Sequence, residues 1–272
     1  MFRRDRCRLV FFSTIIAILS ALAGCGAMDT AAGRVANPSL EKVELLVSAA
    51  VSMADSLQDI QAMYEKKQPQ VALRFSFGAS GSLRRQIEQG APVDLFLSAG
   101  EQNMKSLADA QIVDGDDHSA LFSNELVVIV PADSALSIRQ MEDLLSANVK
   151  SVAIGDPRTV PAGMYAQEAL ASMNAWEPLQ SKTVFGNNVR QVLAYVETGN
   201  ADAGMVYKTD ALATDKVKAV LAVDSGSHRP IHYYIGIVKE TKHREQAKAF
   251  YHFLQGQEAR DIFTRYGFGN VR

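Results

Sequence analysis

Four turns in this sequence place small or hydroxyl-bearing residues between an expected strand and an expected helix. They are Ala49-Ala50-Val51-Ser52, Gly78-Ala79-Ser80-Gly81-Ser82, Val160-Pro161-Ala162-Gly163 and Gly186-Asn187-Asn188-Val189. Each turn leaves backbone N–H groups free at the start of a helix, where the helix dipole attracts anions. Small residues also let an anion come close to the backbone. The chemistry that these residues could perform is therefore the binding of an anion.

Helix capping alone would also explain any one of these turns. Ser52 with Asp55 three residues later has the pattern of a capping box, and Asn188 is a favourable N-cap residue. Four such turns in one α/β chain with an export signal instead favour an anion held by uncharged donors.

Strands and helices are expected to alternate along the body of the chain, from about residue 41 to 272. Expected strands cover residues 43–48, 71–77, 94–98, 126–130, 152–154, 203–207, 217–223 and 231–238, and expected helices cover 54–67, 83–89, 164–174, 189–198 and 244–255. This alternation predicts an α/β fold with mostly parallel sheets, in which ligands bind at the carboxyl ends of strands. The body is longer than a typical domain, which favours two lobes.

Composition excludes several classes of protein. The chain has 272 residues, of which 47% are hydrophobic and 21% charged, as in ordinary globular proteins. A formal net charge of −2 gives no reason to expect a nucleic-acid partner. Two cysteines are too few for a disulfide-rich scaffold or a four-cysteine zinc site.

The N-terminus has the pattern of an export signal. Residues 1–8 contain four arginines, and the apolar run 9–23 is short for a membrane span but suits a signal peptide. The run ends in Leu22-Ala23-Gly24-Cys25, which resembles a bacterial lipoprotein signal in which Cys25 is lipidated and becomes the new N-terminus. An ordinary secretory signal with an incidental cysteine is the alternative.

We therefore expect residues 1–24 to be a lipoprotein signal peptide and residues 25–40 a lipid-anchored, flexible tether of small and polar residues. The body would then work outside the cytoplasmic membrane, held to its outer face by the lipid on Cys25, and in the periplasm if the cell has two membranes.

From about Val43 to Phe268 the chain resembles the molybdate-binding proteins of ABC importers, which have the periplasmic-binding-protein type II fold. The stretches that carry the resemblance are SAAVSMADSLQDI, FSFGASGSLRRQIEQGAPVDLFLSA, NELVVIVP, AIGDPRTVPAGMYAQEAL, NVRQVLAYVETGNADAGMVY and FYHFLQGQEARDIFTRYGF. The resemblance implies two lobes, each a mostly parallel sheet flanked by helices, that close on one tetrahedral oxyanion without a charged side chain or a metal ion.

The same resemblance implies which residues bind the oxyanion. From the first lobe, two serines would each offer a hydroxyl and backbone donors; from the second lobe, two backbone N–H groups and a tyrosine hydroxyl would complete the site. These residues are Ser52, Ser80, Ala162, Val189 and Tyr207. The first lobe is expected to comprise residues 41–125 and 233–272, and the second residues 126–232, with 126–130 and 233–238 crossing between them.

The expected function is the capture of molybdate, and also tungstate, for delivery to the permease and ATPase of an ABC importer. The resemblance implies no cofactor, no catalytic residue and no bound metal cation, and we expect a monomer. A monohydrogen phosphate ion would favour an acidic acceptor, and none of the five ligand-binding positions is acidic.

Other functions remain open at this point. Sulfate has the same charge and shape as molybdate in a smaller ion. A ferric-ion site could use Tyr233 and Tyr234, but neighbours in a strand point to opposite faces. An exported enzyme could use Ser52 or Ser80 as nucleophile with a histidine base, although no Gly-x-Ser-x-Gly elbow surrounds either serine. An adhesive lipoprotein would not need the four turns.

Overall fold

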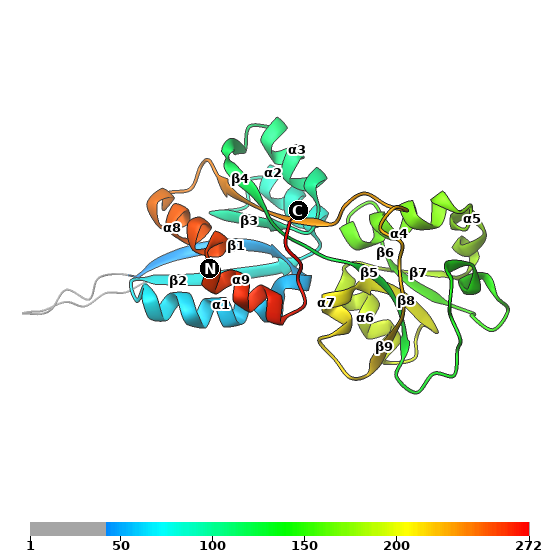
Figure 1. The fold of residues 1–272 in the computed structure, drawn as a ribbon. Coiled ribbons are helices and arrows are strands. Elements are labelled where there is room, and N and C mark those ends of the chain that lie inside the picture. Colours follow the sequence, from blue (N-terminus) through cyan, green and yellow to red (C-terminus); the bar gives the residue numbers. More distant parts are fainter. Residues whose placement is uncertain (1–41, 272) are drawn as a thin grey trace, which may run out of the picture. The chain divides into compact units, whose positions relative to one another are not determined.

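The structure of the protein is a computed structural model that describes residues 42–271. The expected signal peptide, Cys25 and the expected tether of residues 25–40 lie outside the described residues. The described chain forms two five-stranded sheets, each flanked by helices (Figure 1). We call each sheet with its helices a lobe.

The first lobe contains the chain's first four strands and a strand that returns from the second lobe. Its strands are β1 (Val43–Ala50), β2 (Val71–Gly78), β3 (Leu95–Ser98), β4 (Val113–Ser123) and β10 (His232–Val238). Its helices are η1 (Val51–Met53), α1 (Ala54–Lys67), α2 (Ser80–Glu88), α3 (Glu101–Asp109), α8 (Arg244–Gln255) and α9 (Gln257–Arg265). The strand order is β2-β1-β3-β10-β4.

The second lobe is built from the chain between β4 and β10. Its strands are β5 (Leu126–Pro131), β6 (Val152–Gly155), β7 (Thr183–Gly186), β8 (Ala203–Tyr207) and β9 (Val217–Ala222). Its helices are η2 (Met141–Leu145), α4 (Pro161–Ser172), α5 (Trp176–Leu179), η3 (Gln180–Lys182), α6 (Val189–Glu197) and α7 (Lys208–Ala211). The strand order, β7-β6-β8-β5-β9, matches the pattern of the first lobe.

Each sheet has one strand that runs against the other four. In the first lobe β1, β2 and β3 are parallel, and β10 is antiparallel to both β3 and β4. In the second lobe β6, β7 and β8 are parallel, and β5 is antiparallel to both β8 and β9. The reversed strands β5 and β10 are those that directly follow the two passages of the chain between the lobes. The prediction of mostly parallel sheets in an α/β fold is confirmed in this form.

The sheet of the first lobe is buried on both faces. Leu95 and Leu97 of β3 belong to the large core cluster that also includes α1, α8 and α9, whereas Phe96 between them packs against α2 and α3. Successive side chains of a strand point to opposite faces, so an uninterrupted apolar strand needs helices on both sides. The apolar run 126–130 in the second lobe is buried for the same reason.

Several helices and strands of the structure are not predicted from the sequence. Helices α3 and α9 and strands β4 and β7 were not expected, and α2 begins at Ser80 rather than at residue 83. Strand β4 contains Asp114, Asp116 and Asp117, whose polarity hides a strand from a pattern analysis. The earlier start of α2 matters, because it puts Ser80 in the first helical turn.

Close packing of α4 on β6 depends on a glycine. A Cβ built on Gly163 would overlap the carbonyl oxygen of Gly155, and a Cβ on Gly155 would lie 2.5 Å from the Val160 side chain. The bare backbones therefore let the first turn of α4 lie directly against the end of β6. Pro161 at the first helical position helps to start the helix there, because its fixed φ suits a helix and it has no N–H to satisfy.

We expect the substitution Gly163→Ala to destabilise the protein by about 1–3 kcal/mol, because the added methyl group forces α4 away from β6. Urea denaturation measures this loss. Gly115→Ala is the matched control, since a Cβ on Gly115 meets nothing within 4 Å. Equal stability of the two variants would contradict the proposed packing.

Candidate anion-binding site

All five residues expected to bind the anion line one cavity between the two lobes. It is formed by the ends of β1, β2 and β8, the segment after β3, and the starts of α4 and α6. The lining residues are Ala50, Val51, Ser52, Gly78, Ala79, Ser80, Ala99, Val160, Pro161, Ala162, Val189 and Tyr207. None of them carries a side chain that is ionised near neutral pH, so the walls offer uncharged polar groups and apolar surface.

Ser80 presents its hydroxyl as a hydrogen-bond donor. It is the first residue of α2 and is 1% exposed. Its Oγ accepts a hydrogen bond of 3.0 Å from the backbone N–H of Ala99. Because that bond occupies the oxygen, the hydroxyl hydrogen remains available to an acceptor in the cavity.

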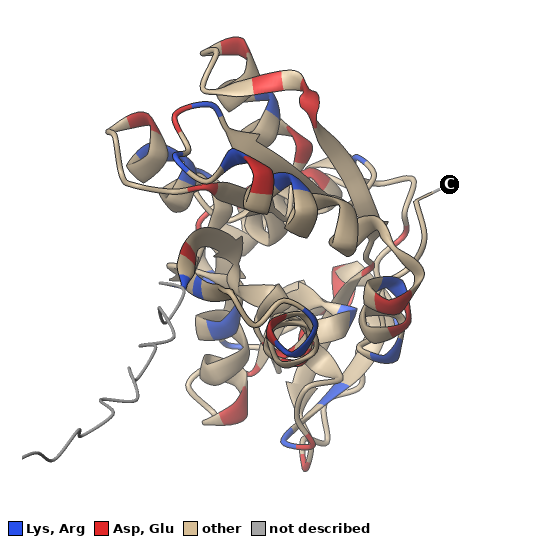
Figure 2. Ribbon diagram, turned by 90° about the vertical axis from the view of Figure 1, so that its left-hand side faces the viewer, with Lys and Arg blue, Asp and Glu red and all other residues tan. Residues whose placement is uncertain are grey.

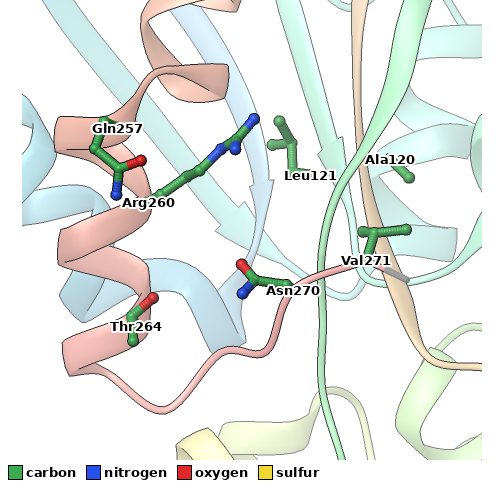
Figure 3. Close-up of a pocket in the computed structure, with 7 residues that line it drawn as sticks. All are labelled: Ala120, Leu121, Gln257, Arg260, Thr264, Asn270 and Val271. Carbon is green, nitrogen blue, oxygen red and sulfur yellow. The ribbon is translucent and has the colours of Figure 1, made fainter.

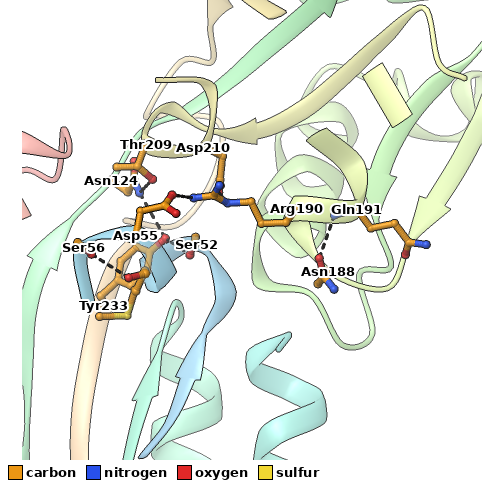
Figure 4. Close-up of polar contacts among 11 residues, drawn as sticks. Ser52, Asp55, Ser56, Asn124, Asn188, Arg190, Gln191, Thr209, Asp210 and Tyr233 are labelled. Atoms are coloured by element: carbon orange, nitrogen blue, oxygen red, sulfur yellow. Dashed lines mark hydrogen bonds and ion pairs between the residues drawn. The ribbon is translucent and has the colours of Figure 1, made fainter. Parts of the chain in front are cut away.

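Ser52 is oriented in a similar way by a chain of hydrogen bonds (Figure 4). Asn124 Oδ1 accepts from the N–H of Glu125, which fixes the direction of its amide. Asn124 Nδ2 therefore donates to Tyr233 Oη at 3.3 Å and to Thr209 Oγ1 at 3.0 Å. The Tyr233 hydroxyl lies 2.8 Å from Ser52 Oγ and can donate its own hydrogen to it. With Tyr233 as the donor, the hydrogen of Ser52 is free for the cavity.

Helix capping, the alternative explanation for the turn at Ser52, is not what the structure shows. Ser52 lies inside η1, and neither η1 nor α1 has a side-chain hydrogen bond at its N-cap. The hydroxyl contacts Tyr233 instead, 181 residues away in sequence. A local sequence pattern cannot reveal such a partner.

Helices α4 and α6 add backbone donors from the second lobe. Ala162 is the second residue of α4, and Val189 is the first residue of α6. First-turn N–H groups have no acceptor inside their own helix. At α6 the Asn188 side chain accepts from Gln191 N at 2.9 Å, as expected for an N-cap, and this leaves the N–H of Val189 unused by the cap.

Tyr207 closes the cavity from the end of β8. Its hydroxyl donates a hydrogen bond of 3.3 Å to the carbonyl oxygen of Ala99 in the first lobe. Burial raises the pKa of Tyr207 well above its ordinary value of 10, and the nearby Tyr233 adds to the effect. The phenol therefore keeps its proton at neutral pH and acts as a donor.

The cavity is tight in this structure. Its volume of about 10 Å³ is close to the minimum that holds one water molecule. A five-atom oxyanion needs more room, so the lobes must separate slightly to admit one. A second contact between the lobes lies beside the cavity, where the N–H of Gly81 donates to Thr159 O at 3.0 Å. A Cβ on Gly81 would lie 2.7 Å from that oxygen, so glycine permits this approach.

Two alternative sites find no support in the described residues. Tyr233 is buried in the large core cluster, whereas Tyr234 packs against the smaller cluster under α2 and α3, so their hydroxyls do not converge. Within residues 42–271 no group of three or more histidine, cysteine, aspartate or glutamate residues could hold a metal ion. The hydrogen bonds of Ser52 and Ser80 go to Tyr233 and Ala99, and neither joins a histidine.

A larger hollow of about 350 Å³ lies between β4, α9 and the C-terminal residues (Figure 3). Arg260 is the one charged residue that lines it, and the hollow shares no residue with the cavity between the lobes.

Over both lobes, basic and acidic segments are interspersed (Figure 2). No helix of the described residues is long and apolar enough to cross a membrane.

Comparison with known proteins identifies the family and the fold of this chain. Residues 45–269 match the family model of bacterial extracellular solute-binding proteins, and the chain belongs to this family. The solved periplasmic molybdate-binding protein of Azotobacter vinelandii is similar in fold, with a TM-score of 0.76 at 24% identity over 84% of this chain and all of that one. The fold is thus the two-lobed periplasmic-binding-protein type II fold, as expected.

Two curated relatives are similar over nearly their whole length. YvgL of Bacillus subtilis is 43% identical over 94% of this chain and 97% of its own. Its name describes it as a candidate substrate-binding lipoprotein of an ABC transporter. The molybdate-binding protein ModA of Escherichia coli is 38% identical over 92% of this chain and 97% of its own.

Sequence reasoning missed the residues that orient the site. Tyr233 is a candidate from the sequence only as an iron ligand and as the start of a crossing segment. Asn124 and Ala99 lie in stretches that carry the resemblance, but the sequence assigns neither of them a role in the site. Nothing in the spacing of Asn124 and Tyr233 predicts that they meet, because β4 and β10 become neighbours only in the folded sheet.

Burial raises the pKa of Tyr207, so this phenol should stay protonated in the native protein near pH 10, where exposed tyrosines ionise. We therefore expect Tyr207→Phe to leave the amplitude of that ultraviolet absorbance change unaltered in the folded protein. In denaturant the same substitution should reduce the amplitude, since the chain has eight tyrosines and all are then exposed. A reduced amplitude in the folded protein would show that Tyr207 ionises there.

Proposed function

We propose that this protein captures molybdate, and tungstate as well, outside the cytoplasmic membrane and delivers it to an ABC importer. The observation that supports this most directly is a cavity without a charged side chain in which three hydroxyl groups meet two first-turn backbone N–H groups. Ser52, Ser80 and Tyr207 offer hydroxyl hydrogens, and Ala162 and Val189 offer first-turn N–H groups. The role is binding, without a catalytic residue, a cofactor or a bound metal cation.

A site made of donors suits a fully ionised tetrahedral dianion. Such an ion has no proton to give, so it needs no acceptor from the protein. Monohydrogen phosphate carries a proton and would leave it facing walls that lack a carboxylate. Hydrogen bonds to a charged group contribute about 1.5–3 kcal/mol each, so several of them can support tight binding without an ion pair.

Molybdate is favoured over sulfate by relatedness. The curated relatives from Escherichia coli and Haemophilus influenzae, at 38% and 36% identity, are both named molybdate-binding proteins. Sulfate is the second candidate, because it has the same charge and shape and differs mainly in size.

Binding is proposed to move the Tyr207 hydroxyl from one acceptor to another. In the structure it donates to the Ala99 carbonyl oxygen at 3.3 Å, a long bond that a charged acceptor can replace. The lobes separate to admit the anion and close again with it between them. We propose that the lobes comprise residues 41–125 with 233–272, and residues 126–232. The chain crosses just before β5 and just before β10, rather than within residues 126–130 and 233–238 as expected from the sequence, because both strands lie inside a sheet.

The partners follow from this role. The closed protein presents both lobes to the permease of an importer driven by its ATPase, and it acts as a monomer. The lipid on Cys25 anchors it to the outer face of the cell membrane. The name given to YvgL, which describes it as a candidate lipoprotein, supports this location.

Calorimetric titration of residues 26–272 with four anions tests the function. We expect one-to-one binding of molybdate and tungstate and no heat from sulfate or phosphate. Ser80→Ala should weaken molybdate binding by about 10- to 100-fold, because it removes one hydrogen bond to a charged group. Ser82→Ala is the matched control, since Ser82 lies in the same helix but does not line the cavity.

Each contrary result has its own meaning. Tight sulfate binding would keep the site and change the ligand. Equal affinities of the Ser80 and Ser82 variants would remove Ser80 from the site. Silence with all four anions would overturn the transport role.

Membrane attachment is tested separately by Cys25→Ser in cells. Because the thiol is the only attachment point that this proposal allows, we expect the variant to be found in the soluble extracytoplasmic fraction while the parent remains with membranes. Cys7→Ser is the control, since Cys7 leaves with the signal peptide. Membrane association of the Cys25 variant would contradict the lipid anchor.

A further inference from the structure

One arginine beside the cavity pairs with carboxylates from both lobes (Figure 4). Arg190 is the second residue of α6, directly after Val189. Its Nη2 lies 2.5 Å from Asp55 Oδ2, which belongs to the first turn of α1 in the first lobe. Its Nε lies 2.7 Å from Asp210 Oδ1 in α7 of the second lobe. The guanidinium thus joins two helices whose neighbouring turns line the cavity.

Asp210 fixes Arg190 to the second lobe. The Asp210 side chain is fully buried, and burial raises the pKa of its carboxyl to about 6 although Arg190 opposes the shift. A buried carboxylate that loses its cation is strongly destabilising, so this pair is retained whether or not the lobes touch. The Arg190 side chain, 25% exposed, is therefore held in place before Asp55 arrives.

Asp55 is the partner that can separate from Arg190 when the lobes part. Its side chain is 42% exposed, so water can solvate the carboxylate as soon as the lobes part. Within residues 42–271, two ion pairs join residues assigned to different lobes. Lys208 pairs with Glu125 where the chain passes from the first lobe into β5, whereas Asp55–Arg190 joins a helix of one lobe to a helix of the other beside the cavity. The other contacts between the lobes near the cavity are hydrogen bonds between uncharged groups: Gly81 with Thr159, Tyr207 with Ala99, and Asn124 with Thr209.

We propose that Arg190 is a closing latch, which pairs with Asp55 only when the lobes come together and so slows release of the bound anion. This inference rests on the proposed function for its effect on release. The pair adds stability to the closed form alone, so its loss shifts the population toward the open form and weakens apparent binding.

Simple charge repulsion predicts the opposite change in anion affinity when Asp55 is replaced. Asp55 is a negative charge three residues from Ser52, near the site of a dianion, and its removal would strengthen anion binding if repulsion were its main effect. Removal would weaken binding if the latch were its main effect. The direction of the change therefore decides between the two roles.

Asp55→Asn is the test, and Asp59→Asn is its matched control. Asp59 lies one turn later in α1 and carries the same charge, but its partners Tyr266 and Arg265 belong to the first lobe. We expect Asp55→Asn to speed molybdate release and weaken its binding by about 3- to 10-fold, as for one partly exposed ion pair. Asp59→Asn should leave both unchanged, and both variants should remain folded, with a single cooperative urea transition.

Small-angle scattering of the ligand-free proteins gives a second readout that needs no ligand. A latch makes Asp55→Asn more expanded than Asp59→Asn. If the parent binds molybdate and the two variants release it equally fast, or if Asp55→Asn binds more tightly, the latch is overturned and the proposed function stands. If the parent binds none of the anions, the proposed function fails and the scattering comparison alone decides the latch.

A cycle of variants identifies the partner. In a background that carries Arg190→Gln together with Asp210→Asn, which leaves no unpaired buried carboxylate, Asp55→Asn should have no further effect on release, because the pair is already broken. A full additional effect would show that Asp55 acts through some other group.

Discussion

For a polar cavity to offer hydrogen-bond donors to an anion, the acceptor atoms of its walls must already accept hydrogen bonds from other groups of the protein. Each hydroxyl oxygen has lone pairs as well as a proton and rotates to suit its neighbours, so a neighbour that donates to the oxygen is what keeps the proton available to an anion. In this protein the oxygen of Ser80 accepts from a backbone N–H, and that of Ser52 lies next to a tyrosine whose own oxygen accepts from an amide. Burial keeps the third hydroxyl, that of Tyr207, protonated. The polarity of the site is thus set by groups behind its walls.

The fold supplies this arrangement through the ends of its strands. Parallel strands place their carboxyl ends on one edge of each sheet, and the helices that follow begin there with free N–H groups. The reversed strand of each sheet brings in residues that the parallel strands cannot. Strand β10 places Tyr233 behind Ser52, and the segment between β4 and β5 places Asn124 within reach of both lobes.

Sequence reasoning could predict the parts of this structure that depend on local pattern. The apolar strands, the helix of residues 54–67 and the Asn188 cap follow from periodicity and residue type, and the resemblance supplied the five lining residues. The partner of Ser52 could not be predicted, because it comes from a strand 181 residues away. The pairing of Arg190 with Asp55 has a similar origin, since it depends on how two lobes meet rather than on any spacing. Strand β4 was missed because its acidic residues resemble a solvated loop.

The position of β10 also governs the order in which the chain can fold. Strand β4 pairs with β10 and with no other strand of the described chain, and β10 lies between β3 and β4 in the sheet. All five strands of the second lobe are contained in residues 126–222. When the chain emerges N-terminus first, all strands of the second lobe are therefore available while the first lobe still lacks β10. Until Val238 has emerged, β3 and β4 remain open edges, and the lobe synthesised first is the last to become whole.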